Sequence, residues 1–95
     1  MEKTPWGTMM FLKSKRAENW AGFAGKVAEH IDNYTVPQYG DEGSDQASEW
    51  SPDMLVEQAR KYINRYGKQR RKGEEKLDLI KAAHYIQMAH DKLGE

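Results

Sequence analysis

The sequence contains no cysteine among its 95 residues. This excludes disulfide bonds, zinc sites built on thiolates and cysteine nucleophiles. Because small secreted domains often depend on disulfides, the absence favours a reducing compartment, and we expect a cytoplasmic protein. Long hydrophobic runs are also missing: no segment approaches the roughly 20 apolar residues that cross a bilayer, so we expect no membrane partner. The apolar run at residues 9–12 is too short for a signal peptide.

Apolar residues are scarce in general. Hydrophobic residues make up 38% of the chain, charged residues make up 32%, and the mean hydropathy is −0.98. A chain of this length is expected to form one domain, residues 1–95, with only a small core. Aromatic residues, at 11%, are too frequent for a generic disordered chain. Either the chain ends are disordered, or a homo-oligomer such as a dimer supplies the missing apolar burial.

The net charge is zero, yet the two signs are separated along the chain. Residues 28–57 contain eight acidic residues and no Lys or Arg, whereas residues 60–72 contain seven basic residues and no acid. Lys and Arg neutralise phosphates, so the basic segment is a candidate anion site for a nucleotide or a nucleic acid. A solvated loop that pairs with the acidic segment is the alternative. The candidate anion-binding residues are Arg60, Arg65, Lys68, Arg70, Arg71 and Lys72.

Apolar residues recur at helical spacing, which predicts an all-α fold with three main helices. The first helix is expected over residues 15–33, with Ser14 as the N-cap. Its apolar stripe consists of Trp20, Phe23, Val27 and Ile31. Residues 34–50 contain Pro, Gly and several acids, and we predict a long acidic loop there. The pattern in residues 1–14 assigns no structure to them, and we leave their order open.

The second and third helices carry clear end signals. Ser51 is a good N-cap with Pro52 as the first helical residue, Trp50 is placed to pack on Leu55, and Gly67 is a natural stop. The third helix is expected over residues 74–93. A short linker predicts that these two helices form an antiparallel hairpin, with the first helix packed across it. The predicted buried face of the third helix comprises Leu79, Ala82, Ala83, Ile86, Ala89 and Leu93.

Carboxylates near the start of the third helix raise the question of a metal. Glu75 and Asp78 lie three residues apart on one helical face, and Glu57 lies on the facing helix. Such carboxylates can hold Mg²⁺ together with water and a phosphate. The simpler interpretation, which we prefer, is an acidic first turn that stabilises the helix through its dipole. We therefore expect no cofactor, with Mg²⁺ as the alternative.

Histidines and tyrosines give weaker signals. His30, His84 and His90 share no metal-ligand spacing, and we interpret them as structural. Tyr62 and Tyr66 are able to stack on nucleic-acid bases, but both lie on an apolar stripe and are expected in the core.

Two segments carry a resemblance to known proteins. The first is Lys61-Tyr62-x-x-Arg65-x-Gly67-Lys68, and the second is Asp78-Leu79-x-Lys81-Ala82-x-x-Tyr85. Together they resemble a two-helix signature in small phage-encoded helical proteins of unknown function. The match covers about the last 35 residues. It implies a helical hairpin and a phage or mobile-element origin, and it implies no activity.

A looser similarity is to the all-α nucleotide pyrophosphohydrolases of the MazG type, which bind Mg²⁺ through E-x-x-E and E-x-x-D motifs. Glu75 and Asp78 match the second motif, but Glu57 is followed three residues later by Arg60, a base where the family has an acid. We therefore expect a non-catalytic binding module with a nucleotide or nucleic-acid phosphate as its partner. A Mg²⁺-dependent pyrophosphohydrolase and a protein–protein adaptor are the alternatives.

Overall fold

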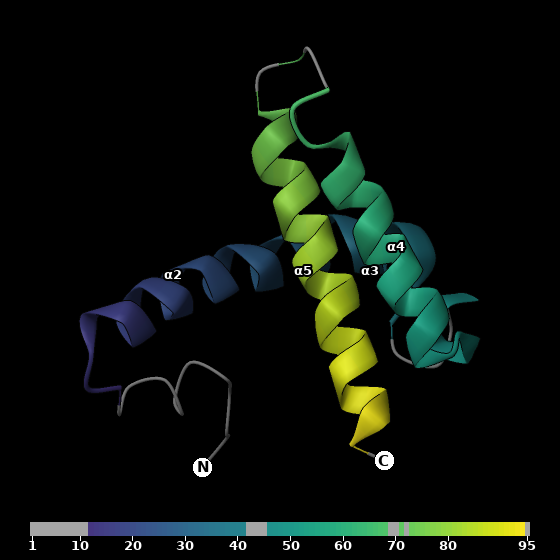
Figure 1. Cartoon of the computed structure of the whole chain (residues 1–95), viewed down its shortest axis with the longest axis horizontal. Coiled ribbons are helices and arrows are strands. Elements are labelled where there is room, and N and C mark those ends of the chain that lie inside the picture. The colour runs from purple at the N-terminus through teal and green to yellow at the C-terminus, as the bar shows by residue number, and fades with distance from the viewer. Residues whose placement is uncertain (1–11, 42–45, 69–70, 72, 95) are drawn as a thin grey trace.

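The computed structural model describes residues 12–41, 46–68, 71 and 73–94 (Figure 1). Every regular element among these residues is a helix and none is a strand, which confirms the all-α fold. In chain order the elements are α2 (Lys15–His30), the π-helical η1 (Ile31–Thr35), α3 (Val36–Tyr39), the 3₁₀ turn η2 (Gln46–Glu49), α4 (Pro52–Arg65) and α5 (Glu74–Leu93). In the described part of the chain, no helix combines the length and the apolar character that crossing a membrane requires.

Helix α2 begins where the sequence predicts, because the Ser14 hydroxyl accepts a hydrogen bond from the Ala17 N–H at 3.1 Å. The helical path then continues through η1 and α3 to Tyr39. Residues 34–39 are therefore helical, although the sequence predicts a loop there. The other half of the predicted loop contains η2, while residues 42–45 lie outside the described residues, as do residues 1–11 of the N-terminal segment.

Pro37 explains the π-helical turn. Proline lacks an N–H, and in an α-helix its ring crowds the carbonyl four residues back, which here is that of Asn33. A wider turn relieves this crowding, and the Val36 N–H accordingly donates to the carbonyl of Ile31, five residues earlier. The helix ends at Gly40, whose φ of 95° favours glycine. Pro37 is part of the reason that the sequence predicts a loop here. In the structure it instead accompanies a wider turn within a helix that continues to Tyr39.

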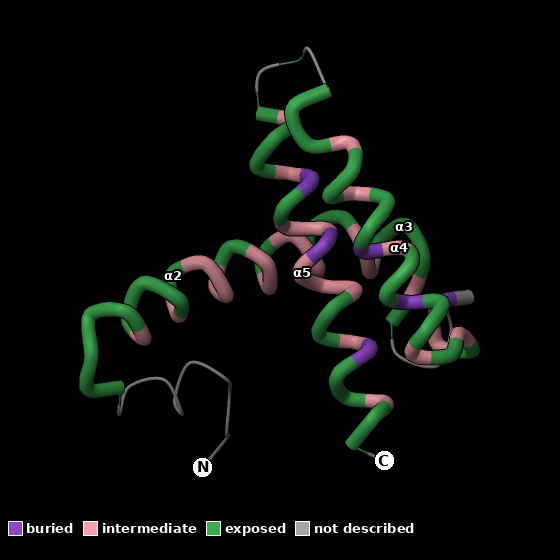
Figure 2. Tube along the Cα trace, viewed as in Figure 1, coloured by how far each residue is buried: buried purple, intermediate pink, exposed green. Residues whose placement is uncertain are grey.

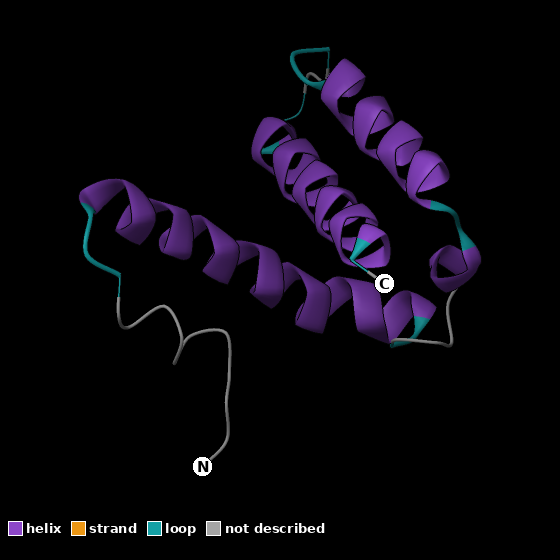
Figure 3. Ribbon diagram, turned by 60° about the horizontal axis from the view of Figure 1, so that its bottom comes forward, coloured by secondary structure: helices purple, strands orange, loops and turns teal. Residues whose placement is uncertain are grey.

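Helices α4 and α5 lie side by side and form the most extensive contact between elements (Figures 1 and 3). Helix α4 starts as predicted, with the Ser51 hydroxyl accepting from the Met54 N–H at 3.2 Å. Trp50 packs against the buried cluster that contains Leu55. Gly67 follows the end of α4 with a φ of 80°, in agreement with its predicted role as the stop. The bounds of α5 also match the prediction.

The predicted buried face of α5 is partly wrong. Ala82 and Ala89 are buried, but Leu79, Ile86 and Leu93 are 44%, 52% and 75% exposed. The apolar stripe of α5 is wider than the surface that α4, its main neighbour, covers. Small residues meet at the contact with α4, so the helices approach closely and the larger side chains remain on the flank.

The core of the described residues is small. Its buried apolar residues are Ala47, Leu55, Ala59, Ala82 and Ala89. No residue of α2, all of which is described, is buried, and Figure 2 shows this helix in the colours of exposed and intermediate positions only. Its N-terminal part extends away from the hairpin, and Trp20 is 59% exposed beside the ring of Phe23 (Figure 1).

Candidate functional site

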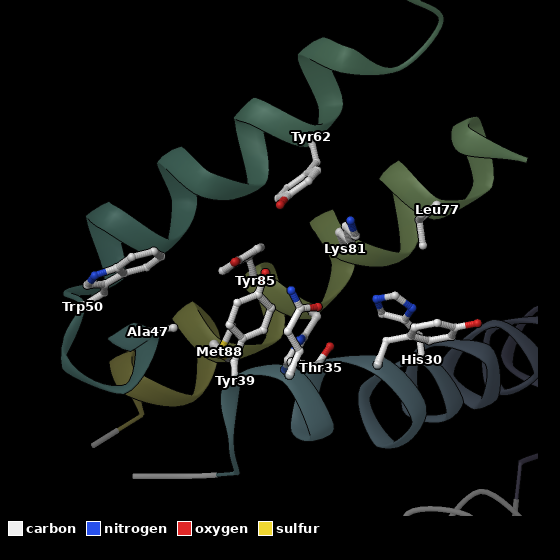
Figure 4. Close-up of a pocket in the computed structure, with 13 residues that line it drawn as sticks. His30, Thr35, Tyr39, Ala47, Trp50, Tyr62, Leu77, Lys81, Tyr85 and Met88 are labelled. Atoms are coloured by element: carbon white, nitrogen blue, oxygen red, sulfur yellow. The ribbon is translucent and has the colours of Figure 1, made fainter. Parts of the chain in front are cut away.

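A cleft of about 730 Å³ opens where α4 and α5 meet the helical segment of residues 30–39 (Figure 4). Its volume falls in the range of small-molecule sites. Residues from three separate stretches of the chain line it: Tyr34 and Tyr39 from the first, Trp50 and Tyr62 from α4 and the residues before it, and a row on α5. The lining residues of α5 are Leu77, Lys81, His84, Tyr85 and Met88.

Stacked aromatic rings form one wall of the cleft. Tyr85 stacks with two other rings: the ring centroid of Trp50 is 6.3 Å away and that of Tyr62 is 5.8 Å away. The planes are nearly parallel, with angles of 20° and 11°. Such offset stacking stabilises the contact between rings and leaves flat apolar surface at the wall. A planar aromatic ligand can extend this stack.

Lys81 brings a positive charge to the same wall. Its Nζ lies 5.4 Å from the centroid of the Tyr62 ring, within the range of a cation–π contact. The guanidinium carbon of Arg65 lies 5.6 Å from the same ring. Lys81 also lines the cleft, whereas Arg65 does not. The ammonium of Lys81 is therefore placed to meet an anionic group on a ligand whose ring lies against the tyrosines.

His30 lines the cleft on the helical segment that faces α5, and the charge of Lys81 affects its pKa. It lies against Tyr34, with the ring centroids 5.3 Å apart. Partial burial and the positive charge of Lys81 both lower the pKa of His30 below its ordinary value of 6.5. The imidazole is thus mainly neutral at pH 7. In this neutral form it can donate one hydrogen bond to a ligand without adding positive charge to the cleft. An anion bound beside Lys81 would offset the repulsion that lowers this pKa.

The basic residues predicted as the anion site lie elsewhere. Arg60, Arg65 and Lys68 are brought together around a shallow surface of α4, outside the cleft. Arg60 pairs with Glu57 at 3.5 Å, and Arg65 pairs with Asp78 at 3.9 Å. The side chain of Arg71 is exposed, and Arg70 and Lys72 lie outside the described residues. Two of the predicted anion ligands therefore already have carboxylate partners within the chain.

The carboxylates of the alternative magnesium site form no metal-binding group in the structure. All three carboxylates are described, and the described part of the chain contains no group of three or more His, Asp or Glu side chains that could hold a metal ion. Glu57 is on the outer surface of α4, where its side chain is 71% exposed. Asp78 is 1% exposed and faces Arg65. Glu57 is thus exposed and paired with Arg60, whereas Asp78 is buried and paired with Arg65.

The two segments of the signature meet in space. Tyr62 stacks on Tyr85, Arg65 pairs with Asp78, and Lys81 lies over Tyr62. The apolar pattern predicts Tyr62 in the core and gives Lys81 no role. Both residues nevertheless belong to the signature, and their presence on two adjacent helices is the sequence signal that points to the cleft. Comparison with protein-family models, with curated proteins and with solved structures finds no match.

Proposed function

We propose that the protein is a non-catalytic binding module whose cleft takes an anionic aromatic ligand of the nucleotide class. The observation that supports this most is the position of Lys81 beside the parallel rings of Tyr62 and Tyr85. A base stacks on aromatic side chains, and a phosphate is attracted by an ammonium group. One small site with both features suits a ligand that carries both groups on one molecule.

A free nucleotide is favoured over a nucleic acid. Nucleic-acid binding depends on a row of unpaired cations that follows the backbone. Here Arg60 and Arg65 are paired with carboxylates, and the net charge of the chain is zero. The cleft, in contrast, is bordered by three stretches of chain and has the volume of a small-molecule site. The partner is therefore a single nucleotide in this proposal.

The alternative of a Mg²⁺-dependent pyrophosphohydrolase has less support, because Glu57, Glu75 and Asp78 form no common metal-binding group. A cytoplasmic location is part of the proposal and rests on the absence of cysteine. The phage or mobile-element origin likewise rests on the signature alone. Formation of a homo-oligomer is also proposed, and the exposed apolar residues of the hairpin favour it.

The test is an NMR titration with three probes: a nucleoside monophosphate, the matching nucleoside and ribose 5-phosphate. We expect the monophosphate to bind most tightly and to shift backbone signals of Trp50, Lys81 and Tyr85. Lys81→Met should weaken monophosphate binding about tenfold, the equivalent of about 1.4 kcal/mol, and affect the nucleoside much less. Lys61→Met, an exposed lysine of α4 that does not line the cleft, is the matched control. Shifts confined to Arg60, Lys61 and Lys68 would contradict the proposal.

A further inference from the structure

One face of the hairpin carries large apolar side chains that are exposed among the described residues. On α5 these are Leu79, Ile86 and Leu93, which are 44%, 52% and 75% exposed. On α4 they are Val56 and Ile63, which are 37% and 50% exposed. We call these five residues the hairpin face. Large apolar side chains gathered in this way mark interaction sites more often than ordinary surface.

The two rows lie on the same side of the α4–α5 pair. Val56 and Ile63 lie about 80–100° around α4 from the buried Leu55, and Leu79 and Ile86 lie about 80–100° around α5, in the same sense, from the buried Asp78. Because Arg65 meets Asp78 at one end of the pair and Lys92 meets Trp50 at the other, the helices run in opposite directions, and the same rotation points both rows to one side.

Positions seven residues apart lie nearly two helical turns apart, so each helix presents its members in a straight row. At about 100° per residue, Leu79 lies roughly 160° around α5 from Lys81, which lines the cleft. The hairpin face is therefore on the other side of the hairpin from the proposed ligand site.

The small core gives a reason for a partner. Leu55 is the only large apolar side chain among the described residues that is fully buried, and the other buried apolar residues are alanines. A domain of this size is only marginally stable even with a well-filled core. Burying the hairpin face would therefore add large apolar side chains to a described core that contains only one of them.

The size of the hairpin face suits a symmetric dimer. Five side chains at this exposure offer an apolar area on the order of 400 Å². A standard interface takes about 800 Å² from each partner, and about two thirds of its core is apolar. The hairpin face thus supplies most of the apolar core of such an interface, and the polar residues along its edges supply the rim.

We infer that the hairpin face binds the same face of a second copy of the chain, so that two hairpins form a four-helix arrangement. A two-fold axis pairs a surface with itself, and apolar rows at seven-residue spacing are what helices in such bundles bury. The alternation of Ala82 and Ala89 with Ile86 and Leu93 lets α5 contact α4 on one side and the second copy on the other. This inference specifies the self-association included in the proposed function, and it does not depend on the ligand.

The test is sedimentation velocity of the full chain over a wide range of concentrations, with Ile63→Glu, Ile86→Glu and Met54→Glu. We expect the wild type to approach twice its 11.0 kDa mass and the first two variants to remain monomeric. Met54→Glu is the matched control, because Met54 is 51% exposed and lies about half a turn around α4 from Ile63. It should dimerise as the wild type does.

A second measurement covers the case in which the glutamate variants fail to fold. Isotope-filtered NOEs on a mixture of labelled and unlabelled wild-type chains should connect the methyl groups of Ile63 and Ile86 across the interface. A wild type that is monomeric at every concentration, a dimer that Met54→Glu disrupts equally, or an absence of these NOEs would overturn the inference. Ligand binding is measured separately. If the protein dimerises but binds no nucleoside monophosphate, only the proposed ligand site is contradicted.

Discussion

The Nε atom of Arg65 lies 3.9 Å from Oδ1 of Asp78, and this contact joins the end of α4 to the beginning of α5. At the other end of the hairpin, Lys92 Nζ donates to the carbonyls of Ser48 and Trp50 at 2.7 and 2.6 Å. Polar contacts therefore hold both ends of the α4–α5 contact, while small apolar residues fill its middle. This arrangement fixes the relative position of Tyr62 and Tyr85, and so the shape of the cleft wall.

We predict that Arg65→Met lowers the free energy of unfolding by about 2–3 kcal/mol. Removing the cation leaves the carboxylate of Asp78 buried with no opposite charge, and such losses cost about 3–5 kcal/mol for fully buried pairs. The side chain of Arg65 is 40% exposed, and solvent screening weakens its interaction with Asp78. We therefore expect a smaller loss, about 2–3 kcal/mol, than for a fully buried pair. Urea denaturation measures the effect. The double variant Arg65→Met/Asp78→Leu should recover most of the loss.

Arg60→Met is the control for that experiment. Arg60 and Glu57 are both exposed, at 68% and 71%, and exposed pairs contribute about 0–1 kcal/mol. Equal losses in Arg60→Met and Arg65→Met would show that the pair with Asp78 has no special role in the hairpin.

Two N-cap serines with the same type of hydrogen bond should differ in their effect on stability. Ser51→Ala removes the cap of α4, which carries buried residues, and we expect a loss of about 1 kcal/mol in global stability. Ser14→Ala removes the cap of α2, which has no buried residue. It should reduce helical content by circular dichroism and leave the urea midpoint almost unchanged. A midpoint shift as large as that of Ser51→Ala would show that α2 is part of the cooperative fold.

The pKa of His30 should rise in Lys81→Met, because the variant removes the positive charge that lowers it. NMR titration of the imidazole Cε1–H measures this directly. Burial remains, so the pKa should move toward the ordinary value of 6.5 without passing it. An unchanged value would show that Lys81 and His30 do not interact across the cleft.

The same shift predicts a pH dependence of stability. The folded protein binds fewer protons at His30 than the unfolded chain does, since its pKa is lowered in the fold. The associated stability is present above about pH 6.5 and is lost as the pH falls from there through the pKa of the folded state. His30→Gln should remove this part of the slope when urea midpoints are compared across that range. A slope that is the same in both proteins would contradict the assignment.

Pro37→Ala should convert the π-helical turn toward a regular α-helix. Alanine restores an N–H able to donate to the carbonyl of Asn33, and it removes the ring that crowds that carbonyl. The residues after the turn then rotate, which moves Tyr39 at the edge of the cleft. We expect added hydrogen-exchange protection at position 37 together with weaker ligand binding. Unchanged binding with the added protection would show that the turn does not shape the cleft.

The sequence predicts the helices well where their end signals are local. Ser14, Ser51 and Gly67 act through hydrogen bonds or backbone angles within a few residues, and each has its predicted role. Pro37 is read incorrectly, because proline disfavours an α-helix but is compatible with a wider helical turn. Which side of α5 faces α4 is not decided by periodicity, since its apolar stripe is wider than one contact.

The candidate site is predicted less well than the fold. A run of basic residues is visible in the sequence, but whether Arg60 and Arg65 are free depends on carboxylates that folding brings near. The cleft combines residues from three stretches of chain, and only its hairpin residues share a pattern. His30 ends α2 and Trp50 lies in the connection before α4, so nothing in their spacing connects them.

The most direct measurement is a set of intermolecular NOEs between a nucleoside monophosphate and the protein. We expect the base protons to contact the ring protons of Tyr85 and Trp50. In the same titration, the signals of Lys81 should change most. Contacts found only at the shallow basic surface around Arg60 and Lys68, or no contacts at saturating ligand, would contradict it.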